Sequence, residues 1–241
     1  MVKVYSLDGK TKGSVELPRV FSAAYRPDII QRTVVAALAN LRQPYATSPL
    51  AGLQTSGNYF GSRKNHYRQT INKGMSRLPR VKTGGGGLGR VVRLPQAKGG
   101  RRAHPPKGKD YSRKINKKEL KLALDSAVAA TGNRALVESH GHIIGGLELP
   151  VVFEDKLEGL KKASDVKKAL VAVGLHDELD SGKRKKILII VKEDKGIRKA
   201  ASNISGVDVA TVDDMGVDVL APGAKAGRLT VWSESAIKNI K

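Results

Sequence analysis

The sequence contains no cysteine. Disulfide bonds and thiolate metal sites are therefore excluded, and a chain without cysteine suits a reducing compartment. Apolar runs of the length that a membrane-spanning helix needs are also absent, and residues 1–13 lack the apolar stretch of a signal peptide. The sequence thus predicts a cytoplasmic protein without a membrane segment.

Acidic residues are almost missing from one part of the chain. Residues 61–118 hold 18 lysines and arginines but a single acid, Asp110. Residues 1–60 hold seven basic and three acidic residues, and residues 119–241 hold 19 and 18. A field of one sign this dense needs a polyanion, and nucleic acid is the usual one. A membrane surface is the weaker alternative, because the segment has no amphipathic helix with bulky apolar anchors.

Regular patterning is missing from the same segment. Residues 61–115 sustain neither a helical nor a strand period, and ten glycines lie between Gly61 and Gly108. A connection this long is usually functional or disordered. Ordering it costs on the order of 1–2 kcal/mol per residue in backbone entropy, and its few apolar side chains cannot offset that cost. We therefore expect residues 62–112 to be disordered without a partner.

The N-terminal part predicts a hairpin and a helix. Residues 2–6 and 14–17 flank a turn-rich stretch and predict two short paired strands. A helix is expected to begin at Pro27 and to end before Pro44. The apolar residues expected on its buried face are Ile30, Val34, Ala37, Leu38 and Leu41.

The C-terminal half alternates apolar runs with helical patterns. A helix is expected from Asn116, as part of a capping box with Glu119, to about Thr131. Its expected buried residues are Leu120, Leu124, Ala127 and Val128. Predicted strands cover residues 135–138, 150–153, 187–191, 207–212 and 229–232, and predicted helices cover residues 155–161, 164–173, 195–203 and 233–240, with Ser164 and Ser233 as N-caps. This alternation favours an α/β fold with a mostly parallel sheet covered on both faces.

Two patterns could indicate a cofactor or a metal, and neither is supported by its context. Gly84, Gly86 and Gly89 match the dinucleotide pattern G-x-G-x-x-G, but no strand is predicted before them and residues 91–95 cannot open a helix. His140 and His142 offer two imidazoles without a third ligand, so we expect turn or surface histidines. No phosphate-binding glycine loop follows a predicted strand. The sequence thus predicts no cofactor, no metal and no catalytic residue.

The basic segment supplies the candidate RNA-binding residues. Its cations can contact phosphates, arginine planes can stack on bases, and consecutive glycines let the backbone approach a packed surface closely. A proline pair stiffens the chain beside the last of these cations. The candidates are Arg63, Lys64, Arg68, Lys73, Arg77, Arg80, Lys82, Gly84, Gly85, Gly86, Gly87, Arg90, Arg93, Lys98, Arg101, Arg102, His104 and Lys107.

Several stretches together resemble a known family. MSRLPRVKTGGGG at 75–87, RLPQAKGGRRAHPPK at 93–107, and LAPG and GRLTVW after residue 219 are similar to the fourth protein of the large ribosomal subunit in its archaeal form. The resemblance implies a three-layer α/β/α domain, formed by residues 1–60 and 111–241. It also implies a long basic loop, residues 61–110, that threads the rRNA to the wall of the nascent-peptide exit tunnel.

The same resemblance assigns positions along the loop and shows two departures. It implies that Arg77, Arg80 and glycines 84–87 lie toward the tip, with Arg101, Arg102 and His104 on the returning strand. Residues 63–74 are longer than the family pattern, and residues 181–186 are shorter than the glycine- and arginine-rich excursion that the family has there. A second RNA contact at residues 181–186 therefore stays open.

These observations predict a structural rRNA-binding component of the large ribosomal subunit and not an enzyme. The expected partners are large-subunit rRNA and neighbouring ribosomal proteins, without a membrane, a small-molecule substrate or a second copy of the chain. One alternative is an RNA-modifying enzyme with a Rossmann-like domain and a basic arm, which would bind a cofactor. Another is an architectural DNA-binding protein, which would prefer duplex DNA to folded rRNA.

Overall fold

The computed structural model describes residues 1–59, 70–180 and 187–240. The chain divides into two compact units. Unit 1 comprises Met1–Leu41 and Ser112–Lys241, and unit 2 comprises Arg42–Tyr111. Residues 42–59, which the sequence placed with the globular domain, thus group with the basic segment.

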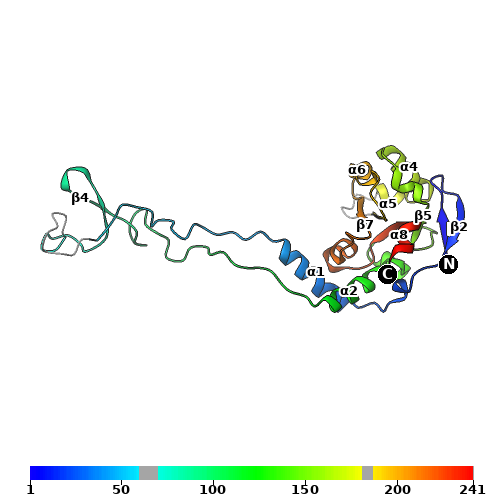
Figure 1. The fold of residues 1–241 in the computed structure, drawn as a ribbon, viewed down its shortest axis with the longest axis horizontal. Coiled ribbons are helices and arrows are strands. Elements are labelled where there is room, and N and C mark those ends of the chain that lie inside the picture. The colour runs from blue at the N-terminus through cyan, green and yellow to red at the C-terminus, as the bar shows by residue number, and fades with distance from the viewer. Residues whose placement is uncertain (60–69, 181–186, 241) are drawn as a thin grey trace. The chain divides into compact units, whose positions relative to one another are not determined.

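Unit 1 is built on one six-stranded sheet. Its strands are β1 (Val2–Tyr5), β2 (Thr11–Val15), β5 (Val151–Phe153), β6 (Ile187–Val191), β7 (Asp208–Thr211) and β8 (Leu229–Ser233), in the order β2-β1-β5-β8-β6-β7. The hairpin of β1 and β2, blue in Figure 1, is antiparallel, and the other neighbouring strands run parallel. The predicted α/β fold with a mostly parallel sheet is confirmed.

Helices connect these strands. They are α1 (Pro27–Leu41), α2 (Lys117–Gly132), α3 (Arg134–Ser139), α4 (Ala163–Ala172), α5 (His176–Asp180), α6 (Ile197–Ala201), α7 (Val217–Leu220) and α8 (Glu234–Asn239). Short 3-10 turns add η1 (Arg19–Ser22), η3 (Asp155–Gly159) and η4 (Pro222–Ala224). Ser233 caps α8 as predicted, since its side chain accepts a hydrogen bond from the Ala236 backbone N–H.

Apolar residues fill a separate core on each face of the sheet. Alternate residues of a strand point to opposite faces, so Leu188 and Ile190 of β6 join one core while Ile187, Ile189 and Val191 join the other. The first core is completed by α1, α2, α7 and α8, and the second by α3, α4, α5 and α6. All five residues of β6 are buried, which explains why this strand is continuously apolar rather than alternating.

Three local predictions for unit 1 are wrong. Residues 135–138, expected as a strand, lie in α3, because a short apolar run fits a buried helix as well as a strand. Helix α4 begins at Ala163, and the side chain of Ser164 bonds to Asp165 rather than capping the helix. Asn116 occupies the N-cap of α2, but its side chain makes no capping hydrogen bond.

The predicted buried faces of α1 and α2 are also wrong at the C-terminal end of α1 and at the N-terminal end of α2. Leu38 and Leu41 of α1 are 54% and 74% exposed, and Leu120 of α2 is 47% exposed. The buried residues of α1 lie between Ile30 and Ala36, and those of α2 lie after Leu122. The helical period therefore identifies the inward face correctly over the middle of each helix. It does not reveal where the core beneath the helix ends.

Unit 2 contains a short hairpin where none was predicted. Strands β3 (Arg80–Lys82) and β4 (Leu88–Val91) pair antiparallel, with the 3-10 turn η2 (Gly84–Gly86) between them. Asn58 extends the ladder, since its backbone N–H and carbonyl both bond to Arg80, at 3.2 and 3.1 Å. The expectation of no strand before Gly84 is thus wrong. The glycines still open no helix, so the dinucleotide pattern lacks its required context.

Candidate nucleic-acid interface

Unit 2 presents many exposed cations and very few acids. In the full sequence, the segment from residue 42 to residue 111 contains 15 lysines and arginines and one acid, Asp110. The exposed candidates among the described residues are Lys73, Arg77, Lys82, Arg90, Lys98, Arg101, Arg102, His104 and Lys107. Within the described ranges, no salt bridge involves Arg77, Arg90 or Lys98. Arg63, Lys64 and Arg68 lie outside the described residues.

Two of the predicted RNA-binding arginines also hold unit 2 together. Arg80 donates from Nη2 to Ser76 Oγ at 2.7 Å and from Nη1 to the Gly89 carbonyl at 3.4 Å. Arg93 donates from Nη2 to the Thr55 carbonyl at 3.0 Å. Both side chains are only partly exposed. Contact of these two guanidinium groups with RNA stays a prediction, and each one already fixes a turn or a neighbouring stretch.

The glycines at the hairpin differ in whether close contacts or backbone conformation require glycine at each position. A Cβ on Gly89 would lie 2.8 Å from Thr83 Oγ1 and 2.9 Å from the Val81 carbonyl oxygen, so the hairpin itself demands glycine there. Gly85 has a φ of +76°, which favours glycine for backbone reasons. Gly84 and Gly87 have neither constraint, since an added Cβ would meet no described atom within 4 Å. The described part of the protein therefore does not itself require glycine at these two positions.

Two long stretches of unit 2, whose traces run in roughly the same direction in Figure 1, are joined by backbone contacts. Thr47 donates its backbone N–H to the Pro106 carbonyl at 3.4 Å. At the two ends of the unit, the Arg42 guanidinium carbon lies 4.1 Å from the centre of the Tyr111 ring. Such cation–π contacts are worth roughly 0.5–1 kcal/mol at exposed sites. The stretches leading into and out of the basic segment therefore contact each other at more than one point.

The comparisons with known proteins decide the family. The family model described as "Ribosomal protein L4/L1 family" matches residues 15–241. The chain belongs to this family. The predicted resemblance is thus confirmed, and membership of this family of ribosomal proteins makes the chain a structural protein and not an enzyme.

Similar relatives cover nearly the whole chain. A protein of Methanococcoides burtonii is 43% identical over 99% of this chain and 96% of its own length. Relatives from Archaeoglobus fulgidus and Haloquadratum walsbyi are each 40% identical over 98% of this chain, and over 96% and 97% of their own lengths. All three are named "Large ribosomal subunit protein uL4".

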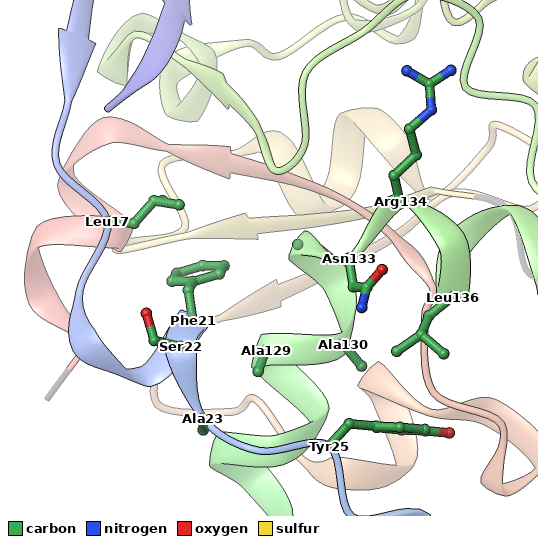
Figure 2. A pocket seen from close by; sticks show the side chains of 11 residues that line it. Leu17, Phe21, Ser22, Ala23, Tyr25, Ala129, Ala130, Asn133, Arg134 and Leu136 are labelled. Carbon is green, nitrogen blue, oxygen red and sulfur yellow. The ribbon is translucent and has the colours of Figure 1, made fainter.

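Unit 1 of this L4/L1-family chain has a hollow that is poorly suited to an anion. A cavity of about 490 Å³ lies between residues 17–25 and the end of α2 with the start of α3, around Phe21 and Leu136 (Figure 2). Its one lining cation, Arg134, points away from Phe21 in Figure 2. Arg134 donates instead to Glu138 Oε1 at 2.7 Å and to the Gly145 carbonyl at 2.8 Å. The Arg134 guanidinium is thus already paired within the protein and is not directed at a ligand in the cavity.

The carboxyl edge of the parallel strands contains a buried acid that the sequence analysis missed. Glu158 of η3 is 2% exposed. Its Oε1 accepts hydrogen bonds from Ser233 Oγ at 2.8 Å and from the Lys192 backbone N–H at 2.9 Å. Glu158 therefore joins η3 to the ends of β6 and β8. A glutamate among helical residues gives no sequence indication of this role.

The histidine pair is partly buried rather than at the surface. His142 is 5% exposed, and its Nδ1 lies 2.7 Å from Oε1 of the fully buried Glu178, so the surface prediction is wrong for this residue. The His140 ring stacks on His142 with centres 5.0 Å apart. Burial, together with the neighbouring His142, lowers the pKa of His140. Among the residues that the structure describes, no group of three or more His, Asp or Glu side chains could hold a metal ion.

The helices give no sign of a membrane segment. Of those in the described part of the chain, none combines the length and the apolar character needed to span a bilayer.

Proposed function

We propose that the protein is a structural component of the large ribosomal subunit, located in the cytoplasm, that binds large-subunit rRNA through unit 2. Membership of the L4/L1 family and relatives named as large-subunit proteins support the subunit assignment. The observation that carries the rRNA-binding proposal is the large excess of exposed cations over acids in unit 2, whose sequence holds 15 lysines and arginines and one acid.

Binding proceeds by neutralising phosphates. Each lysine or arginine that contacts a phosphate releases condensed counterions from the RNA, and this gain in entropy drives association. In unit 1 much of the positive charge has acidic neighbours, such as Glu154 beside Lys12 at 2.7 Å. In unit 2 the cations outnumber the acids 15 to one, so most of their charge is left for an outside partner.

The glycines at 84–87 let the backbone enter a narrow space. Gly84 and Gly87 are exposed, and the described residues leave open space where a side chain would stand. If rRNA occupies that space, a side chain would separate the backbone from the RNA surface. Glycine at these positions therefore fits a backbone that lies against RNA.

The finer parts of the proposal concern the loop and the globular domain. Residues 61–110 form a long basic loop that threads rRNA to the wall of the nascent-peptide exit tunnel, and unit 1 forms a three-layer α/β/α domain. The two apolar cores on opposite faces of the sheet support this layering. Neighbouring ribosomal proteins complete the surroundings of the domain.

Sedimentation tests the proposal directly. A tagged copy of the protein, expressed in its own cells, should co-sediment with large subunits after ribosomes are dissociated into subunits on a density gradient. Its amount should be close to one copy per large subunit, because a structural component is stoichiometric. Recovery only in the unbound fraction, or with small subunits, would contradict the proposal.

A further inference from the structure

A small cavity lies between the two paired stretches of unit 2. Residues 47–53 and 101–106 enclose about 200 Å³. The lining combines five apolar residues with two arginines, namely Pro49, Ala51, Leu53, Pro105, Pro106, Arg101 and Arg102. Few ligands satisfy both kinds of wall, so the mixture restricts the chemistry of what can bind.

Backbone contacts form the walls of this cavity. Gly52 has a φ of +75°, and a Cβ at this position would lie 2.5 Å from the Arg101 Cα atom. The Thr47 hydroxyl and backbone N–H both donate to the Pro106 carbonyl at 3.4 Å. The first stretch therefore lies directly against the second, and the cavity does not depend on flexible side chains alone.

The arginines of the cavity are available to a ligand. Arg101 and Arg102 are exposed, and no hydrogen bond or salt bridge engages either guanidinium within the described ranges. A phosphate alone would satisfy these groups but would leave the proline and leucine surfaces without a partner. A purely apolar ligand would leave the charges unused.

A nucleobase satisfies both requirements. Its flat faces pack on apolar surfaces and on guanidinium planes, its edge carries hydrogen-bonding groups, and a phosphate is attached nearby. We propose that this cavity binds a single base of the rRNA that has been turned out of its stack. The inference rests on the proposed rRNA binding and adds a contact that recognises a base rather than the phosphate backbone.

The size of the cavity and the cost of unstacking define the expected ligand more closely. Its volume is below the roughly 300 Å³ typical of the smallest pockets for drug-sized ligands, and it suits a single heterocycle. Turning a base out of a helix costs free energy, and this cost is smallest for a base that is already unpaired. The expected ligand is therefore a bulged or single-stranded nucleotide.

Two matched substitutions test the proposal. Ala51 lines the cavity, whereas Ala103 is exposed and does not, so Ala51→Trp fills the cavity and Ala103→Trp adds the same ring outside it. Because stacking one base is worth roughly 1–3 kcal/mol, Ala51→Trp should weaken binding to protein-free large-subunit rRNA by about 5- to 150-fold. The slope of log affinity against log salt should not change, since no phosphate contact is removed.

Chemical probing of the same complexes identifies the base. Dimethyl sulfate and a carbodiimide together report the Watson–Crick edges of all four bases. One unpaired nucleotide should be protected in the wild-type and Ala103→Trp complexes and become reactive with Ala51→Trp. Equal affinities and equal reactivities for the two variants would overturn the base site, as would equal losses in both. Failure of the wild-type protein to bind rRNA would instead overturn the proposed function.

Discussion

The two units of this chain differ in how much apolar surface they bury within themselves. Unit 1 buries apolar residues on both faces of a sheet, and even its fully buried Arg228 is paired, with Asp208 at 2.6 Å. In the described part of unit 2, Val92 is the one fully buried apolar side chain. Burying such a side chain contributes roughly 1.5–3 kcal/mol, against roughly 1–2 kcal/mol of backbone entropy for each residue ordered. Unit 1 thus has a core of its own, whereas we expect unit 2 to need a partner for its order.

Removing the cation source tests this contrast most strongly. Replacing residues 70–105 by a short Gly-Ser linker should lower affinity for large-subunit rRNA by several orders of magnitude, because most phosphate contacts disappear. Unit 1 should stay folded, since shortening a loop changes its closure entropy by only about 1 kcal/mol. Filter binding and circular dichroism measure the two effects. Retained affinity, or loss of the fold, would show that the units are not separable in this way.

A charge in the core of unit 1 should have the opposite effect. Ile189 of β6 is fully buried between two neighbouring strands. Ile189→Asp places an unpaired carboxylate there, and we expect the domain to unfold, because burying an unpaired charge costs as much as the roughly 5–15 kcal/mol that stabilises a typical domain. Ile189→Val is the matched control and should cost about 0.5–1.5 kcal/mol. A folded Ile189→Asp protein, as judged by circular dichroism, would contradict the core assignment.

Amide hydrogen exchange should separate the units within the unmodified protein. In the absence of RNA, amides of residues 75–100 should exchange almost as fast as in an unfolded chain, because opening this segment exposes little apolar surface. Amides of β6 should be protected up to the global stability of the domain. Adding rRNA should protect the basic segment selectively. Strong protection of residues 75–100 without RNA would show that unit 2 is stable alone.

The sequence predicts unit 1 better than unit 2 for the same physical reason. The run at 187–191 and the cap at Ser233 depend on local residues and burial, and both match the structure. The hairpin of β3 and β4 was missed because its short strands do not alternate buried and exposed residues, so the sequence shows no strand period there. Likewise, the cavity that includes Arg101 depends on a glycine 49 positions earlier, Gly52, and no local pattern connects them.

Salt dependence should report how many cations act. Each neutralised phosphate changes the slope of log affinity against log salt by about −0.7 to −0.9. If about half of the 18 cations in residues 61–118 engage rRNA, the slope should lie near −6 to −8. Titration of the wild-type complex with potassium chloride gives this number. A slope shallower than about −3 would mean that binding does not depend mainly on the charge density of the segment.

The smallest expected effects come from substituting single arginines. One substitution in each unit compares the role of an arginine in unit 1 with the role of an arginine in unit 2. Arg134 of unit 1 is paired with Glu138, whereas Arg90 of unit 2 is exposed and has no recorded partner among the described residues. Arg134→Gln should lower the free energy of unfolding by about 0.3–0.5 kcal/mol, as expected for a helical ion pair, and leave rRNA affinity unchanged. Arg90→Gln should leave stability unchanged and make the salt slope shallower by about 0.7–0.9. Urea unfolding and filter binding on both variants measure all four quantities. If Arg134→Gln changed the salt slope as much as Arg90→Gln, unit 1 would also contribute phosphate contacts, and the assignment of RNA binding to unit 2 would have to be extended to both units.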